Sequence, residues 1–416
     1  MFVAQNANLA QWLAYLEQLH PSVIDLGLER VGQVAARLGC LKPAPLVITV
    51  GGTNGKGTTS ALLAAVLKAQ GLKVGQYNSP HIHRYNERVS INGLEACDAQ
   101  LCASFRAVEA VRAGVSLTYF EFGTLAALHF FQEQKVDACV LEIGLGGRLD
   151  AVNIVDSDIA VVTSIGLDHQ AFLGDTVEQI AYEKCAIARA GRYLVCGEVS
   201  PPATAKATVE GIGALWCGRN DDFFIQPQPE GLMLEFAYQG RKEHWQLPLA
   251  HIPHHNVATA VQTLALIARL PSQDVVAQVV AGLRVDGRLQ RFQKGALTLT
   301  LDVAHNEQAA RYIGEKLQQV DGLILGMLAD KEPDKVFPVL PKCTQLILVG
   351  LTGYRGQSAH ALSLRADFQP KPELLVDVKS AIMMLPTQGH WLVCGSFHTV
   401  DEALEAIKED AAWRRI

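Results

Sequence analysis

The chain has 416 residues, of which 49% are apolar and 19% charged, a composition typical of a globular protein with roughly two or three domains. Its formal net charge of -6 leaves no basic surplus for a phosphate backbone, so we expect no nucleic-acid partner. No apolar run approaches the length of a spanning helix, and the nine cysteines form no CxxC pair, which predicts a cytoplasmic protein with neither a membrane partner nor a zinc site.

From about residue 45, short β-branched runs alternate with longer amphipathic stretches, which predicts parallel strands covered by helices on both faces. The strands expected in this first sheet are Leu46–Val50, Leu72–Tyr77, Val136–Ile143 and Asp158–Ile165. Helices are expected after residue 55, from a cap at Asp98 to just before Gly114, over Thr176–Ala190, and over His255–Leu270. Between about residues 198 and 255 the periodicity weakens, which favours irregular or antiparallel structure.

A second alternation of strand and helix patterns follows Gly287 and predicts a smaller α/β domain. Its expected strands are Leu297–Val303, Gly322–Met327, Gln345–Val349 and Trp391–Cys394, and its helices include Gln308–Gln318 and Val400–Glu409. We therefore expect an α/β protein with one domain over residues 1–284 and a second over residues 285–416. A cleft between two such units is a favoured place for a ligand.

The strand Leu46–Val50 runs into a glycine-rich loop, Gly51–Thr59, and an amphipathic helix opens directly after it. This order is typical of a phosphate-binding P-loop, in which backbone N–H groups and the helix N-terminus meet phosphate oxygens. Lys56 would supply a cation, and the Thr58 hydroxyl could reach Mg²⁺. Val50 stands where the common pattern has glycine, so the match is to a variant P-loop; a simple glycine-rich turn is the less favoured alternative.

Polar side chains follow the neighbouring strands. Glu142 ends the run Val136–Ile143, Asp168 and His169 follow Asp158–Ile165, and Ser79 follows Leu72–Tyr77. Because the carboxyl ends of parallel strands face the ligand crevice, these donors are expected to collect near the P-loop, where Glu142 and Ser79 suit Mg²⁺. Taken singly, each is as easily a solvated loop residue, and Lys184 by itself reads as a solvated surface lysine beside Glu183.

Together these segments resemble the folylpolyglutamate synthases, which belong with the Mur ligases. The matching segments are Val50–Thr58, Ser79–His81, Leu141–Asp150 and Asp302–Asn306, and the similarity spans nearly the whole chain. The resemblance implies a P-loop ATPase-type domain with a mostly parallel sheet, followed by a smaller Rossmann-like α/β domain. It also implies ATP and Mg²⁺, the metal at two sites, as cofactors.

Carried over to this chain, the resemblance assigns a role to individual residues. The implied metal ligands are Ser79, Glu142 and His169, and a carbamylated lysine falls on Lys184. The implied ATP contacts are Thr53, Asn54, Gly55, Lys56, Gly57, Thr58, Asn256, Arg288 and Asp302. The implied catalytic groups are Lys56, Lys184, Arg288 and His305.

Three further segments look like the dihydropteroate-binding parts of bifunctional bacterial members of this family. They contribute Asp25, Leu26 and Gly27, then Thr118, Tyr119, Phe120 and Glu121, and finally Leu149, Asp150 and Ala151. The resemblance thus implies a monomeric ligase that adds L-glutamate to dihydropteroate and to tetrahydrofolate through an acyl phosphate. The chain departs from the family pattern at Gly51, Ala186, Leu289 and Glu307, none of which removes a charged or metal-binding group.

Three alternatives stay open at this point. The chain could be a folylpolyglutamate synthase alone, a Mur-type ligase acting on a nucleotide-linked muramyl substrate, or a P-loop regulatory ATPase that is not a ligase. The muramyl alternative is disfavoured because only about 45 residues precede the P-loop, too few for the extra nucleotide-sugar domain of that group.

Overall fold

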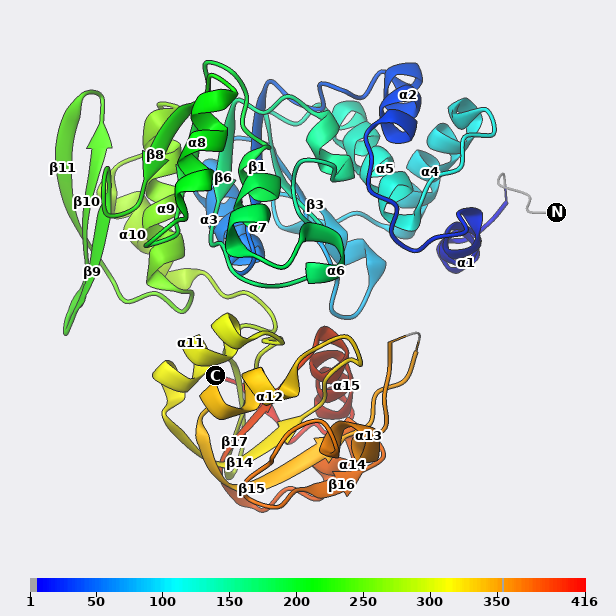
Figure 1. The fold of residues 1–416 in the computed structure, drawn as a ribbon, viewed down its shortest axis with the longest axis vertical. Helices are drawn as coiled ribbons and strands as arrows, with labels where there is room; N and C mark the ends of the chain where they lie inside the picture. Colours follow the sequence, from blue (N-terminus) through cyan, green and yellow to red (C-terminus); the bar gives the residue numbers. More distant parts are fainter. Residues whose placement is uncertain (1–5, 354) are drawn as a thin grey trace. The chain divides into compact units, whose positions relative to one another are not determined.

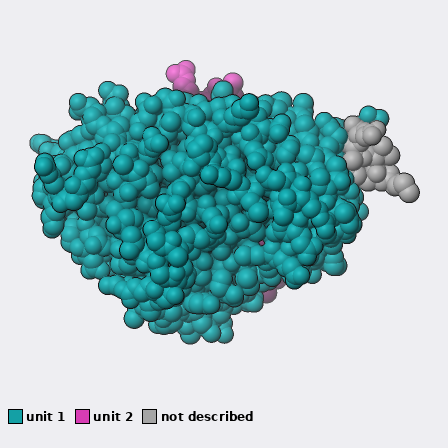
Figure 2. All heavy atoms as spheres, turned by 90° about the horizontal axis from the view of Figure 1, so that it is seen from above, with its two compact units in different colours: residues 1–283 teal, residues 284–416 magenta. Residues whose placement is uncertain are grey.

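The computed structural model describes residues 6–353 and 355–416 and divides into two compact units (Figure 1). Unit 1 ends at Leu283 and unit 2 begins at Arg284, as coloured in Figure 2. Across the residues described, no helix is both long enough and apolar enough to cross a bilayer.

An eight-stranded sheet forms the centre of unit 1, with the strand order β4-β3-β2-β5-β1-β6-β7-β8. The six strands from β2 to β8 in this order are parallel, and β3 and β4 continue the sheet in antiparallel fashion at one edge. The strands are Leu46–Gly51 (β1), Val74–Tyr77 (β2), Val89–Ile91 (β3), Leu94–Glu95 (β4), Ala138–Glu142 (β5), Ile159–Val162 (β6), Tyr193–Cys196 (β7) and Leu215–Gly218 (β8). The carboxyl ends of β2, β5, β1 and β6 therefore lie next to one another.

Helices cover both faces of this sheet, which is why its central strands are buried on nearly every residue rather than on alternate ones. Helices α3 (Lys56–Ala69) and α9 (His254–Leu266) pack on one face, and α10 (Gln273–Gly282) packs against α3. The other face is covered by a single apolar core, to which α1, α2, α4, α5, α7 and α8 contribute. These helices are Leu9–Leu19 (α1), Glu29–Leu38 (α2), Asp98–Arg112 (α4), Tyr119–Glu133 (α5), Val177–Cys185 (α7) and Ala203–Gly211 (α8).

The stretch from residue 198 to 255 was only partly predicted. Strands β9 (Phe224–Gln228), β10 (Gly231–Tyr238) and β11 (Arg241–Leu247) form the expected antiparallel sheet, which extends from unit 1 beside α9 and α10 (Figure 1). Before it, however, α8 and β8 continue the parallel sheet, so the prediction of irregular structure was wrong there. The strand β8 is short and half exposed, which explains its weak periodicity.

Several helix boundaries differ from the sequence prediction: α9 ends at Leu266 instead of Leu270, α11 spans Glu307–Leu317 instead of Gln308–Gln318, and α15 spans Phe397–Lys408 instead of Val400–Glu409. Asp98 is the first residue of α4, whose N-cap is Cys97. Helix α7 starts as expected after Thr176 but ends at Cys185 instead of Ala190. Beyond this end, the guanidinium of Arg189 forms tertiary hydrogen bonds to the carbonyl oxygens of Asn153 at 2.7 Å and Val155 at 3.0 Å, and these bonds hold the chain in a path that is not helical.

Unit 2 is built on a seven-stranded sheet with the order β16-β15-β14-β17-β13-β12-β18, in which the first five strands are parallel. Its strands are Gln290–Lys294 (β12), Ala296–Leu301 (β13), Gln319–Leu325 (β14), Lys342–Val349 (β15), Glu373–Leu375 (β16), Gln388–Cys394 (β17) and Arg414–Arg415 (β18). Its helices are Glu307–Leu317 (α11), Pro333–Val336 (α12), Ala359–Ser363 (α13), Val378–Met383 (α14) and Phe397–Lys408 (α15). The prediction of two α/β units with mostly parallel sheets is confirmed.

The aromatic cluster around Trp12 gives a test of how the N-terminal helix is held. Trp12 is fully buried, and its ring centroid lies 5.6 Å from that of Phe105 and 6.1 Å from that of Phe122. Trp12→Ala should lower the free energy of unfolding by about 3–5 kcal/mol through lost burial and a residual cavity. Leu94→Ala, at a side chain that is 77% exposed, should change it by less than about 0.5 kcal/mol. Urea unfolding followed by circular dichroism measures both; equal effects would contradict the packing argument.

Candidate functional site

The loop between β1 and α3 carries the predicted phosphate-binding residues. The chain turns through Gly52–Gly55, and α3 begins at Lys56 with Gly55 as its N-cap. The Lys56 ammonium folds back over the loop and donates to the carbonyl oxygens of Gly52 at 3.0 Å and Thr53 at 3.3 Å. The free backbone amides of the helix start and this cation together form a region that could hold phosphate oxygens.

Two positions in the loop require glycine, because neighbouring atoms leave no room for a Cβ. Gly52 has a φ of 138°, and a Cβ there would lie 2.0 Å from Thr163 Oγ1. Gly55 has a φ of 84°, and a Cβ there would lie 2.8 Å from the Asn256 side chain. Asn256 in turn donates from Nδ2 to Thr58 Oγ1 at 2.6 Å. The structure therefore brings Asn256, which lies on α9, into direct contact with the phosphate loop, as the sequence resemblance predicts.

The segment after β6 fixes the loop from the other side. Asn54 N donates to Ser164 Oγ at 2.9 Å, and Thr163 Oγ1 donates to Asn54 O at 2.6 Å. Thr53 Oγ1 donates to Gly166 O and accepts from Gly166 N, both at 3.0 Å. Sequence analysis did not identify Thr163 or Ser164, because a hydroxyl that supports a loop has no sequence spacing of its own.

Ser79 and Glu142 meet at the carboxyl ends of β2 and β5, where the sequence placed them. Ser79 N donates to Glu142 Oε2 at 3.3 Å, and Glu142 is 4% exposed. The Ser79 hydroxyl is buried and has no hydrogen-bond partner in the described part of the chain. A Cβ on Gly57 would lie 3.7 Å from Glu142 Oε2, so this pair borders the start of α3. A buried hydroxyl awaiting a partner beside a carboxylate fits Mg²⁺, which prefers oxygen ligands.

His169 lies at the same sheet edge but after a different strand. It follows β6 and immediately precedes the short helix α6 (Gln170–Leu173), with a positive φ of 52°. Since β1 separates β5 from β6, His169 starts from a strand two places away from that of Glu142. Its role as a third metal ligand stays a prediction.

Lys184 is buried, so its interpretation as a solvated surface lysine is wrong. The residue lies on α7, and only 4% of its surface is exposed. Burial, followed by the nearby charge of Lys56, lowers the pKa of Lys184 to about 7, and Asp168 and Asp150 partly oppose that shift. A pKa near 7 means that the amine is protonated below this pH and neutral above it. At neutral pH a large share of Lys184 is therefore an uncharged nucleophile.

Asp150 links the phosphate loop to the predicted substrate segments. It is 2% exposed, and its carboxylate accepts hydrogen bonds from Leu145 N at 2.8 Å and Val152 N at 2.9 Å. Through the second bond it caps the short 3₁₀ helix η2 (Ala151–Ile154). Burial raises its pKa to about 6, while backbone N–H groups and the charge of Lys56 act in the opposite direction.

The three segments predicted to bind the pterin come together in the fold. Gly27 N donates to Leu149 O at 3.3 Å, which joins the first segment to the third. The guanidinium of Arg30 pairs with Asp25 at 2.8 Å and with Glu121 at 3.1 Å, which joins the first to the second. Leu26 lies between Asp25 and Gly27, and Ala151 opens η2. Arg30 was part of the recognised segment, but the pattern alone did not reveal that it bridges two acids.

Aromatic rings from α5 extend this region toward Ser79. Thr118 caps α5 and forms a capping box with Glu121, so the first turn of the helix is fixed. The Phe120 ring lies 6.1 Å from that of Tyr77, the last residue of β2. Tyr119 lies under the guanidinium of Arg88, whose Cζ is 5.5 Å from the ring centroid. Arg88 ends a short 3₁₀ helix, and no sequence motif pointed to it.

In unit 2, the predicted residues Arg288, Asp302 and His305 cluster at the carboxyl end of β13. Asp302 accepts from Leu289 N and Ala304 N, both at 2.9 Å. Burial raises the pKa of Asp302, and the charges of Arg288 and His305 oppose that shift. Arg288 lies over the Phe397 ring at 5.3 Å, and His305 lies 6.2 Å from the same ring. Phe397, which opens α15, is a member of this cluster that sequence reasoning missed.

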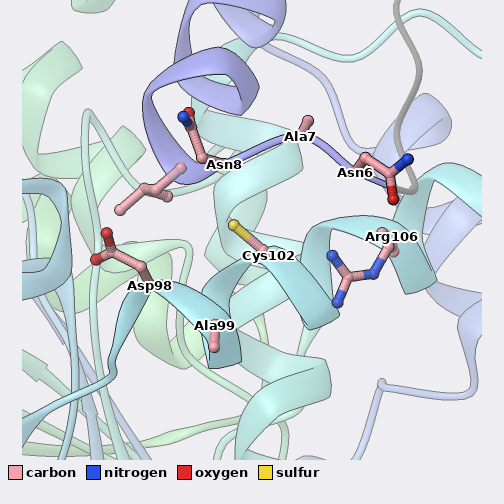
Figure 3. Close-up of a pocket in the computed structure, with 8 residues that line it drawn as sticks. Asn6, Ala7, Asn8, Asp98, Ala99, Cys102 and Arg106 are labelled. Atoms are coloured by element: carbon pink, nitrogen blue, oxygen red, sulfur yellow. The ribbon is translucent and has the colours of Figure 1, made fainter.

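A surface hollow between the start of α1 and α4 is separate from these clusters. Figure 3 shows Asn8, Asp98, Cys102 and Arg106 around it. None of the residues predicted from the sequence to bind ATP, metal or substrate lines this hollow.

Comparisons with known proteins place these observations in a family. Residues 50–267 match the Mur ligase middle domain. The chain is 41% identical over 406 residues to the dihydrofolate synthase/folylpolyglutamate synthase of Escherichia coli strain K12, covering 96% of this chain and 95% of that protein.

Solved structures agree with the sequence match. The structure of E. coli FolC in complex with DHPP and ADP superposes with a TM-score of 0.91 at 39% identity, covering 98% of this chain and 99% of that one. The bifunctional folylpolyglutamate synthase/dihydrofolate synthase of Yersinia pestis, complexed with AMPPNP and Mn, gives a TM-score of 0.90 at 41% identity, covering 98% and 100%.

The contact between Gly55 and Asn256 yields a test of the phosphate loop. Gly55→Ala should weaken binding of an ATP analogue by at least about tenfold, because its Cβ would push against the Asn256 side chain at a strained φ. Gly71→Ala is the matched control, since Gly71 has a φ of 83° but no atom within 4 Å of a new Cβ. The control should lose only about 1 kcal/mol of stability and keep its nucleotide affinity. Calorimetric titration checks both; unchanged affinity in Gly55→Ala would refute the assignment.

Proposed function

Because the chain belongs to the dihydrofolate synthase/folylpolyglutamate synthase family of the Mur ligases, we propose that it is an ATP-dependent amide-forming ligase. It adds L-glutamate to dihydropteroate, forming dihydrofolate, and to tetrahydrofolate, forming polyglutamates. The observation that supports this most directly is the buried Ser79 hydroxyl beside Glu142, next to the phosphate loop. The contacts among the predicted pterin-binding segments support a pterin as the second substrate.

The reaction needs activation because a carboxylate and an amine do not condense readily in water. The γ-phosphoryl group passes from ATP to the acceptor carboxylate; its bond to ADP breaks, and an acyl phosphate forms. The amine of L-glutamate then attacks the acyl carbon, loses a proton, and displaces inorganic phosphate. Such transfers depend on positioning and charge neutralisation rather than on a protein nucleophile.

The residues of unit 1 fit these requirements. Lys56 and the amides of residues 55–58 hold the phosphates, and Thr58 is oriented by Asn256. Ser79 and Glu142 would hold Mg²⁺, with His169 as a further ligand. The bound metal supplies positive charge against the phosphoryl oxygens. In unit 2, Arg288 and Asp302 are proposed as ATP contacts and His305 as a catalytic group.

Lys184 is proposed to carry a carbamate. A neutral amine attacks CO₂ and loses a proton, which converts a cation into an anionic oxygen ligand, and a pKa of about 7 makes the neutral form available. The modification would also relieve the repulsion between Lys184 and Lys56, which contributes to the lowered pKa. A second metal ion would then have an oxygen donor on α7.

Phosphate release measured with different acceptors tests the proposed function. With ATP, Mg²⁺ and L-glutamate present, dihydropteroate and tetrahydrofolate should each trigger phosphate release, and a uridine-diphosphate-muramyl acceptor should not. If tetrahydrofolate triggers phosphate release and dihydropteroate does not, the activity is that of a folylpolyglutamate synthase alone. ATP turnover that ignores both acceptor and glutamate would indicate a regulatory ATPase.

Lys56→Ala should abolish the activation step in the same assay. The loss of the cation from the phosphate loop should cost several kcal/mol of transition-state stabilisation, on the order of a 10²–10³-fold fall in rate. Lys68→Ala, at the far end of the same helix, is the control and should retain the normal rate. A near-normal rate in Lys56→Ala would refute the role of the loop.

Lys184 gives a prediction with a defined pH dependence. Enzyme stripped of CO₂ should be inactive and should recover when CO₂ is restored. Because the folded pKa is about 7, the neutral amine is roughly tenfold scarcer at pH 6 than at pH 8, so recovery at fixed dissolved CO₂ should be slower at pH 6. Lys184→Ala should be inactive under both conditions. Recovery that is independent of CO₂ would exclude the carbamate.

A further inference from the structure

Arg88 occupies a position beside the proposed metal ligands that the proposed function does not yet use. It is the last residue of the 3₁₀ helix η1 (Tyr85–Arg88), and its carbonyl oxygen accepts from Asn78 N at 2.9 Å. The next residue, Val89, pairs with Tyr77 in the sheet. Arg88 therefore lies against the residue that precedes Ser79, at the carboxyl end of β2.

The Arg88 guanidinium is held in place by its surroundings. Its Nε donates to His81 Nδ1 at 2.8 Å. Its Cζ lies 5.5 Å from the ring centroids of both Tyr85 and Tyr119. The buried Tyr77 hydroxyl is a further hydrogen-bonding neighbour. A cation fixed by two rings and an imidazole loses little freedom when it binds a ligand, which favours a preorganised site.

Arg88 is one of the half-buried arginines of unit 1, together with Arg106 and Arg219, for which the described residues provide no ion pair with a carboxylate. Arg30, Arg112, Arg148 and Arg189 each form an ion pair with a carboxylate. For Arg88, no ion pair with an acidic side chain exists within residues 6–353 and 355–416. A guanidinium has five N–H groups, so terminal donors remain for a planar anion, and a carboxylate matches their geometry.

The position of Arg88 indicates which carboxylate it meets. Tyr119 belongs to the proposed pterin segment, and Ser79 belongs to the proposed metal site. A substrate that binds at the pterin segment and reacts at the metal site must bring its acceptor carboxylate close to the Arg88 guanidinium. We propose that Arg88 binds the acceptor carboxylate of the pterin substrate, the group that ATP activates, in both reactions.

This inference rests on the proposed function and adds a chemical reason for the residue. The acceptor carboxylate must approach phosphoryl oxygens of the same charge. A fixed guanidinium offsets that repulsion and aims one carboxylate oxygen at the phosphorus. Tetrahydrofolate is longer than dihydropteroate by a glutamyl unit, so a common carboxylate anchor implies that the two pterin rings lie at different distances from Arg88.

A thermodynamic cycle tests the proposal. The affinities of the wild-type chain and of Arg88→Met are measured by calorimetry, in the presence of Mg²⁺ and an ATP analogue, for dihydropteroate and for an analogue whose carboxylate is replaced by hydrogen. Removing the carboxylate should weaken binding to the wild-type chain by roughly 10- to 100-fold. The same change should alter binding to Arg88→Met by less than about twofold.

Two further variants keep the test decisive. Arg84→Met is the matched control, because Arg84 lies four residues earlier and forms a surface ion pair with Glu95 at 2.5 Å; it should behave as wild type. Arg88→Lys keeps the charge over the two rings and replaces Arg88→Met if that variant fails to fold. It should retain part of the discrimination.

The outcomes separate this proposal from the proposed function. If the wild-type chain binds and converts dihydropteroate but the two changes are additive, the role of Arg88 is overturned and the ligase function stands. The same holds if Arg88→Met raises only the KM for L-glutamate, which would assign the cation to the amine substrate. A wild-type chain that fails to bind dihydropteroate would overturn both.

Discussion

The hydrogen bonds between the parallel strands β2, β5, β1 and β6 fix the relative positions of the phosphate loop, Ser79 and Glu142 in unit 1. Because these strands run in one direction, their carboxyl ends open at one edge, and each end delivers a different group there. The end of β1 delivers the phosphate loop, that of β2 Ser79, that of β5 Glu142, and that of β6 the segment with Thr163 and Ser164. Each of these groups lies close to the end of its strand, so the sheet holds the groups in place.

This arrangement concentrates charge where little water can screen it. Lys56 and Lys184 repel one another, and each is influenced by the buried carboxyl of Asp150. As a result, burial lowers the pKa of Lys184 to about 7 and raises the pKa of Asp150 to about 6. Under the proposed function, an anion bound beside Lys56 would lessen the repulsion between the two lysines. The fold thus provides a site whose electrostatics are completed by its ligands.

The sequence predicted the fold class and most elements because apolar runs and glycines mark buried parallel strands and their turns. The strand Leu46–Val50, the loop to Lys56 and the placement of Glu142 follow from patterning alone. Asn256, by contrast, is 198 positions from Thr58 in the chain, and only the resemblance to a family connected it with the loop. Arg88, Phe397 and the bridging role of Arg30 escaped detection because they depend on stacking and ion-pair contacts, which leave no periodic pattern in the sequence. The shortened α7 was missed because the segment after it is held by tertiary hydrogen bonds from Arg189 to the carbonyl oxygens of Asn153 and Val155, which the sequence pattern does not show.

The hydrogen bonds that Lys56 makes within the phosphate loop affect which anion can bind there. The Lys56 ammonium already donates two hydrogen bonds to carbonyl oxygens of its own loop. An anion that recruits this lysine must exchange those bonds for better ones, so chloride or a lone inorganic phosphate gains little. A polyphosphate, which also satisfies the helix-start amides, can complete the exchange. We therefore expect this lysine to favour a ligand with several phosphate groups over a single small anion.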